Sequence, residues 1–133
     1  MQTVIRVRRY RCRACGAVVT VVPRGVAQGR HFGAGAIGLA LHGWGLEHRS
    51  LEEVRQLVGG HDVERRGWPA ARRWVDAVQA GHLFGGRIRP CPPGWPRVRI
   101  AERAATTLLG LGRPVADSAD LQVQLFAGAA LAA

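Results

Sequence analysis

Two cysteines near the N-terminus have the spacing of a metal-binding knuckle. Cys12 and Cys15 in RCRACG are separated by two residues and are followed by Gly16. Two thiolates at this spacing can bind one ion, and a glycine after the second allows the positive φ that turns the backbone amides toward the sulfurs. A tetrahedral zinc site needs four ligands, so Cys12 and Cys15 are metal candidates that supply half of the set.

The remaining ligands are not evident in the sequence. Cys91 lies far along the chain in PCPP, and the five histidines are scattered without ligand spacing beside a cysteine. We interpret Cys91 as a loop cysteine without a chemical role. A redox function for Cys12 and Cys15 is disfavoured because no βαβ pattern surrounds them, which leaves a reduced pair in a turn as the alternative to metal binding.

Charge gives the second indication of function. The formal net charge is +10, and all 19 basic residues are arginine. Residues 1–30 carry seven arginines and no acid, and residues 87–113 carry six arginines and Glu102 alone, whereas the segment between them is neutral. A small domain this basic attracts polyanions, of which nucleic acid is the commonest.

Periodicity indicates the elements that must position these residues. β-Branched segments at 3–11 and 17–22 flank the cysteine turn and predict a hairpin. Helical spacing of apolar residues begins near Ala34, and a capping box from Ser50 to Glu53 opens a helix over 50–58. Pro69 opens another over 68–80, a Gly/Pro loop follows at 85–96, and two further helices are expected after residue 97.

The helices at 50–58 and 68–80 have the order of a helix-turn-helix, with the second as the recognition helix. Its outward Arg72 and Arg73 could reach phosphates or guanine edges, and Arg65 and Arg66 could hold the backbone nearby. The connector of about eight residues is longer than the usual three or four. An ordinary helical hairpin with solvated arginines is therefore an open alternative. In both cases Trp68 and Trp74 are expected to anchor the core.

The motifs RVRRYRCRACGAVVTVVP and GWPAARRWVDA together resemble the N-terminal DNA-binding region of bacterial insertion-sequence transposases and its small stand-alone relatives. The resemblance covers roughly residues 4–84 and implies a zinc ribbon followed by a helix-turn-helix. In that pattern the Cys12–Cys15 knuckle is the second of two, so the first would precede Thr3, where this chain has no room for it. Zinc is therefore a cofactor for which only half of the ligands are present.

We expect a mainly α protein with three parts: a β-hairpin over 1–26 that forms half of a zinc ribbon, a helix-turn-helix-like domain over 34–84, and a loop with C-terminal helices over 85–133, giving four to five helices. The expected function is non-catalytic binding of double-stranded DNA. The expected DNA-binding residues are Arg6, Arg8, Arg9, Arg11, Arg13, Arg65, Arg66, Arg72 and Arg73. The chain lacks the carboxylate-bearing domain that transposase chemistry requires, so we do not expect an enzyme.

Two alternatives stay open: a helical protein–protein or regulatory module, as a homodimer or with a partner transposition protein, and an inert remnant of a mobile element. No apolar segment resembles a signal peptide or a membrane span. We therefore expect a cytoplasmic protein with no membrane partner.

Overall fold

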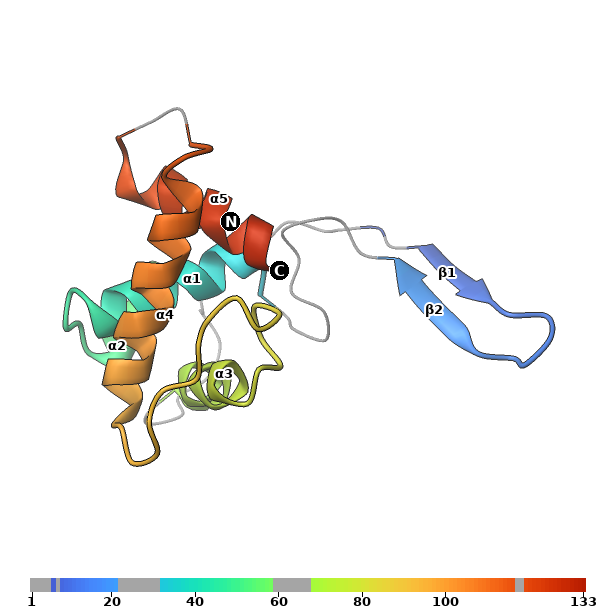
Figure 1. The fold of residues 1–133 in the computed structure, drawn as a ribbon, viewed down its shortest axis with the longest axis horizontal. Coiled ribbons are helices and arrows are strands. Elements are labelled where there is room, and N and C mark those ends of the chain that lie inside the picture. The colour runs from blue at the N-terminus through green and yellow to red at the C-terminus, as the bar shows by residue number, and fades with distance from the viewer. Residues whose placement is uncertain (1–5, 7, 22–31, 59–67, 117–118) are drawn as a thin grey trace.

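A short hairpin followed by five helices makes up the part of the chain described by the computed structural model, which covers residues 6, 8–21, 32–58, 68–116 and 119–133. The predicted mainly α fold with a small N-terminal β-hairpin is confirmed. Its elements are β1 (Arg8–Arg11), β2 (Val18–Val21), α1 (Ala34–Gly45), α2 (Leu51–Leu57), α3 (Pro69–Gln79), α4 (Arg97–Gly112) and α5 (Leu121–Ala132). Figure 1 shows the hairpin standing apart from the helices.

The hairpin carries no core of its own. Its strands pair antiparallel with Tyr10 opposite Val19 and Arg8 opposite Val21, so these four residues share one face. Tyr10, Val19 and Val21 are nevertheless 53%, 58% and 55% exposed. An isolated two-stranded hairpin is only marginally stable in water, so this one lacks the buried surface that ordinarily supports a sheet.

Helix α1 is the central element of the helical part. Its most extensive contacts are with α4 and α5, and it also contacts α2 and α3. Ile37 and Leu41 are fully buried among these helices. Glycines of α1 lie at its contacts: a Cβ on Gly45 would collide with the backbone of Ala101 and Glu102. Burial of α1 thus compensates for its low intrinsic helix propensity.

Helices α4 and α5 approach each other through glycine. A Cβ on Gly112 would collide with the carbonyl oxygen of Gln124, and one on Gly128 with the carbonyl oxygen of Leu108. Leu108 of α4 and Leu125 of α5 are buried, and both lie near Gly38 of α1. The sequence predicted both helices, but not that their backbones meet so closely.

The short helix α2 begins as its sequence predicts. The Glu53 N–H donates to Ser50 Oγ at 3.2 Å, and the Ser50 N–H donates to Glu53 Oε2 at 2.8 Å, which completes the capping box. The apolar side chains of α2 are only partly buried: Val54 is fully covered, whereas Leu57 is 41% exposed. Helix α2 therefore contributes one anchor to the core, because it is short and packs mainly against α1.

The Gly/Pro loop before α4 is attached to the core. Ile88 and Cys91 of the loop and Phe84 directly before it are buried. No packing role for this loop was predicted from the sequence. The side-chain amide of Gln79 in α3 forms two hydrogen bonds with the backbone of Cys91. The Gln79 Nε2 donates to the Cys91 carbonyl oxygen at 2.7 Å, and the Cys91 N–H donates to Gln79 Oε1 at 2.9 Å. Cys91 is a loop cysteine, as predicted, but it is a buried part of the core rather than a residue without a role.

Candidate nucleic-acid interface

Helix α3 presents two arginines opposite its buried face. Ala71, Trp74, Val75 and Val78 are buried against the core, and their spacing places them on one face of the helix. Arg72 and Arg73 lie on the other side and are exposed. Neither forms an ion pair with any acid in the part of the chain that is described. Among the described residues, therefore, no acid competes with an external anion for these two guanidinium groups.

An aromatic cluster fixes the start of α3. Trp68, directly before the helix, meets Trp74 edge-to-face at 5.1 Å between ring centroids, and Phe32 meets the two rings at 6.1 and 5.2 Å. Such contacts contribute about 0.5–1.5 kcal/mol each beyond the burial of the rings. Trp74 is buried and Trp68 half-buried, so both tryptophans pack as core anchors, as the sequence predicted.

An ion pair joins the exposed face of α3 to α4. Arg97 donates from Nε and Nη2 to the two carboxylate oxygens of Asp76, at 2.9 and 3.1 Å. These hydrogen bonds hold the pKa of Asp76 below its ordinary value and raise that of Arg97. Because Asp76 is one turn beyond Arg72 and Arg73 on α3, the start of α4 is held beside the face that carries them.

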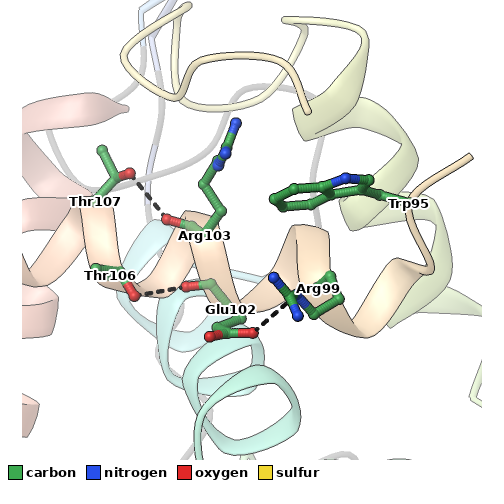
Figure 2. A pocket seen from close by; sticks show the side chains of 6 residues that line it. All are labelled: Trp95, Arg99, Glu102, Arg103, Thr106 and Thr107. Atoms are coloured by element: carbon green, nitrogen blue, oxygen red, sulfur yellow. Dashed lines mark hydrogen bonds and ion pairs between the residues drawn. The ribbon is translucent and has the colours of Figure 1, made fainter. Parts of the chain in front are cut away.

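A second arginine cluster follows on α4 and surrounds an open cavity of about 230 Å³ (Figure 2). The guanidinium carbons of Arg99 and Arg103 lie 5.0 and 4.6 Å from the centre of the Trp95 ring. Both distances are within the range of cation–π attraction. Arg103 also donates to the Pro90 carbonyl oxygen at 3.3 Å, and Arg99 lies 3.5 Å from a carboxylate oxygen of Glu102.

The arginine cluster around Trp95 was not predicted from the sequence as a binding site. Residues 87–113 were recognised as basic, but Arg97, Arg99 and Arg103 were assigned no binding role. The signal was present in the sequence: in GWPRVRIAER, arginines stand two, four and eight residues after Trp95. Helical spacing alone puts Arg99 and Arg103 on one face, whereas the stacking of Trp95 requires the fold of the preceding loop.

The hairpin holds the other predicted site residues. Arg6, Arg8, Arg9, Arg11 and Arg13 are all exposed, and they form no ion pair with the described acids. The structure does not bring them next to α3, because the hairpin lies away from that helix (Figure 1). Arg65 and Arg66, predicted beside α3, lie outside the described residues.

The cysteine turn has the geometry of a knuckle. The Gly16 N–H donates to the Cys12 carbonyl oxygen at 2.9 Å, and the Cys12 N–H donates to the Ala17 carbonyl oxygen at 2.7 Å. Gly16 has a φ of +73°. Hydrogen bonds from the backbone N–H and the thiol of Cys15, together with the backbone N–H of Ala14, lower the pKa of the Cys12 thiol. The donors are placed where a metal-bound thiolate would use them.

Among the residues that the structure describes, two ligands meet at this turn. Within the described residues, no group of three or more histidine, cysteine or acidic side chains is placed to hold a metal ion. Cys12 and Cys15 are exposed, whereas Cys91 is buried in the helical part. The residues present would therefore suit zinc in chemistry but supply half of the coordination shell.

No helix among the described residues has the length and apolar character needed to cross a bilayer. A scan against protein-family models and searches of curated proteins and of solved structures returned no match to this chain.

Proposed function

We propose that this protein binds double-stranded DNA as a non-catalytic, transposase-like DNA-binding protein. The observation that carries the proposal is the exposed face of α3, where Arg72 and Arg73 lack acidic partners among the described residues while the opposite face is anchored in the core. A helix held rigidly from behind can enter a groove without ordering itself first, which reduces the entropic cost of binding.

The dimensions of α3 suit the major groove. Its 11 residues correspond to a length of about 16 Å. The groove of B-form DNA, about 12 Å wide, admits a single α-helix. Arg72 and Arg73 would then contact base edges or the phosphates beside them, because they project from the side of the helix that faces away from the protein.

Two further sets of arginines support the proposal. Arg99 and Arg103 lie on α4, the helix tied to α3 by the Asp76–Arg97 pair, and would extend the basic surface along one strand of the duplex. The hairpin arginines form a separate basic segment that could follow the backbone beyond the main contact. Phosphate contacts of this kind position a protein on DNA without specifying sequence.

A salt titration of duplex binding tests the proposal. Each phosphate contact contributes a slope of about −0.9 to log affinity against log salt, so several contacts give a steep decline. The double substitution Arg72→Ala/Arg73→Ala should weaken binding and make the slope shallower by about two. Arg113→Ala is the matched control, because Arg113 is an exposed arginine at the other end of α4. A flat salt response, or equal effects of the two variants, would contradict the proposal.

The same experiment addresses the alternative of a protein-interaction module. That alternative predicts no retention of the chain on duplex DNA at physiological salt, and self-association that Arg72→Ala/Arg73→Ala leaves unchanged. Competition with unrelated duplex sequences then separates sequence-specific from general binding, because only base contacts through α3 depend on sequence.

A further inference from the structure

Exposed apolar side chains of the helical part gather near its C-terminal end. Among the described residues of α1–α5 and their connections, six large apolar side chains are exposed, and one of them, Leu57, belongs to α2. The other five lie between residues 115 and 131: Val115, Leu121, Val123, Phe126 and Leu131. Exposed apolar residues scattered singly are ordinary, whereas a concentration of them marks an interaction surface.

Helix α5 is mainly apolar on two opposite faces. Its inner face is buried against α1 and α4 and is formed by Gln124, Leu125, Gly128, Ala129 and Ala132. Its outer face is formed by Val123, Phe126, Ala127 and Ala130, which stand at positions i, i+3, i+4 and i+7 of one side of a helix. Val123 and Phe126 are 45% and 41% exposed. A helix that is apolar all round is normally buried, yet the described residues leave the outer face of α5 largely uncovered.

The charge of the chain limits what can cover this face. Residues 121–133 contain no charged side chain, although the whole chain has a net charge of +10. Helix α5 thus offers no arginine to a phosphate backbone, and a helix that lies in a membrane surface normally carries lysine or arginine beside its apolar face. Two copies of this chain repel each other through their arginines. They therefore meet with the least repulsion along α5, where arginine is absent.

We propose that the outer face of α5 packs against the same face of a second copy, with the two helices antiparallel about a two-fold axis. Large and small side chains share this face, as a self-complementary contact requires. Residues 126 and 130 are equally far from Gly128 in the sequence, so an axis beside Gly128 places Phe126 of each copy opposite Ala130 of the other. The outer face of α5 is then complementary to itself in size as well as in charge.

The size of the contact makes the dimer reversible. Helix α5 has 12 residues, so it is about 18 Å long and about 10 Å across. One face of such a helix is smaller than the roughly 800 Å² per partner of a standard stable interface. We therefore expect a dimer whose share of the chains rises with concentration. Figure 1 shows α5 and α3 on opposite sides of α1, so this dimer leaves Arg72 and Arg73 exposed and does not rest on DNA binding. Retention on duplex DNA, rather than self-association, then separates DNA binding from a protein-interaction module.

Sedimentation equilibrium of the full chain without DNA measures the association, with a reductant and a chelator present so that cysteines and metal ions link no two copies. The average mass should rise from 14.3 kDa toward twice that value as the concentration of the chain increases. Val123→Glu and Ala130→Glu should each hold the mass at the monomer value. Because glutamate lowers the net positive charge, this loss cannot come from greater repulsion between the copies. Both variants keep Phe126 and its position close to Gly35 of α1.

Two further variants locate the contact and test its packing. Leu57→Glu is the matched control, because Leu57 is as exposed as Phe126, at 41%, but lies on α2; it should associate as the parent does. Ala130→Phe keeps the face apolar but places two large rings opposite each other, so it should weaken association. Phe126→Ala/Ala130→Phe exchanges the large and the small side chain. The two-fold axis again sets phenylalanine opposite alanine, so this double variant should restore association.

Three outcomes would overturn the proposal: a mass that stays at 14.3 kDa up to the highest soluble concentration, an equal loss of association in Leu57→Glu, or tighter association of Ala130→Phe, which undirected apolar contact would give. None of them bears on the salt-dependent binding of duplex by Arg72 and Arg73. Conversely, loss of DNA binding in Arg72→Ala/Arg73→Ala with unchanged self-association would leave this inference standing.

Discussion

Asp76 of α3 and Arg97 of α4 are 21 positions apart in the sequence, yet they form a bidentate ion pair with hydrogen bonds of 2.9 and 3.1 Å. Both side chains are about half exposed, at 55% and 50%. The pair lies beside Arg72 and Arg73 and neutralises Arg97, the first arginine of α4. It therefore affects the proposed DNA surface in two ways, by fixing the position of α4 and by reducing the local positive charge.

Asp76→Asn tests this relationship, because it keeps the shape of the side chain and removes its charge. The free energy of unfolding should fall by less than about 1 kcal/mol, since exposed ion pairs contribute little. Duplex affinity should rise modestly because Arg97 becomes available to phosphate. Thermal melting and the salt titration measure the two effects. A loss of affinity with unchanged stability would show instead that the position of α4 matters more than its charge.

Gly128 provides a test of the contact between α4 and α5. In Gly128→Ala the added Cβ would collide with the carbonyl oxygen of Leu108, so the two helices must move apart. Overpacking of this kind typically costs about 1–3 kcal/mol. Chemical denaturation should therefore show a clear loss of stability.

The matched control for that substitution is Gly110→Ala, also in a helix. A Cβ on Gly110 would meet no atom within 4 Å. Alanine is favoured over glycine in a helix by up to about 1 kcal/mol, so this variant should be more stable than the parent. Equal effects of the two substitutions would mean that helix propensity, rather than the close approach of α5, governs both positions.

The features predicted from sequence are those encoded within a few neighbouring residues. The Ser50–Glu53 capping box, the start of α3 at Pro69 and the burial of Trp74 are set by local hydrogen bonding and by periodicity. The contacts missed were the Asp76–Arg97 pair and the hydrogen bonds between Gln79 and Cys91. Both contacts join residues more than ten positions apart, and no pattern of spacing in the sequence predicts such a contact.

The residues of the candidate site also include some that local sequence patterns predicted and some that only the fold brings together. Helical periodicity placed Arg72 and Arg73 outward, and the C-x-x-C-G pattern predicted a turn with a left-handed glycine, observed at Gly16. The stacking of Arg99 and Arg103 on Trp95 depends on how the Pro-rich loop returns to α4. A charge count marked the segment as basic, but only the fold shows which arginines share a surface.

Acid should destabilise the protein. The pKa of Glu53 is lowered chiefly by the backbone N–H of Ser50, and those of Glu47, Glu52 and Asp76 by Arg49, Arg55 and Arg97 respectively. A carboxylate with a lowered pKa stabilises the folded state fully above its ordinary pKa, 4.5 for Glu53, and this stabilisation is lost as the pH falls through its lower folded value. The free energy of unfolding should therefore decline as the pH falls below the ordinary pKa of these carboxyl groups.

Glu53→Gln separates one contribution from the others. Glutamine can keep the capping-box hydrogen bond to the Ser50 N–H but does not titrate. The decline in the unfolding free energy between neutral and acidic pH should be shallower in this variant than in the parent. An identical pH profile would mean that the lowered pKa of Glu53 does not contribute to stability.

The Trp95 cluster provides a test of whether α4 belongs to the DNA surface. Arg99→Ala/Arg103→Ala removes the charges of exposed Arg99 and half-buried Arg103, which share one helix face. On the proposed function it should make the salt slope of duplex binding shallower by about two. Trp95→Leu leaves both arginines in place and removes only the ring on which they stack. Trp95→Leu should leave the salt slope of duplex binding unchanged. Its affinity for duplex DNA should change only because the two guanidinium groups have greater conformational freedom. If instead the double arginine variant matches Arg113→Ala, the duplex does not reach this face of α4, and the DNA contact is confined to α3 and the hairpin.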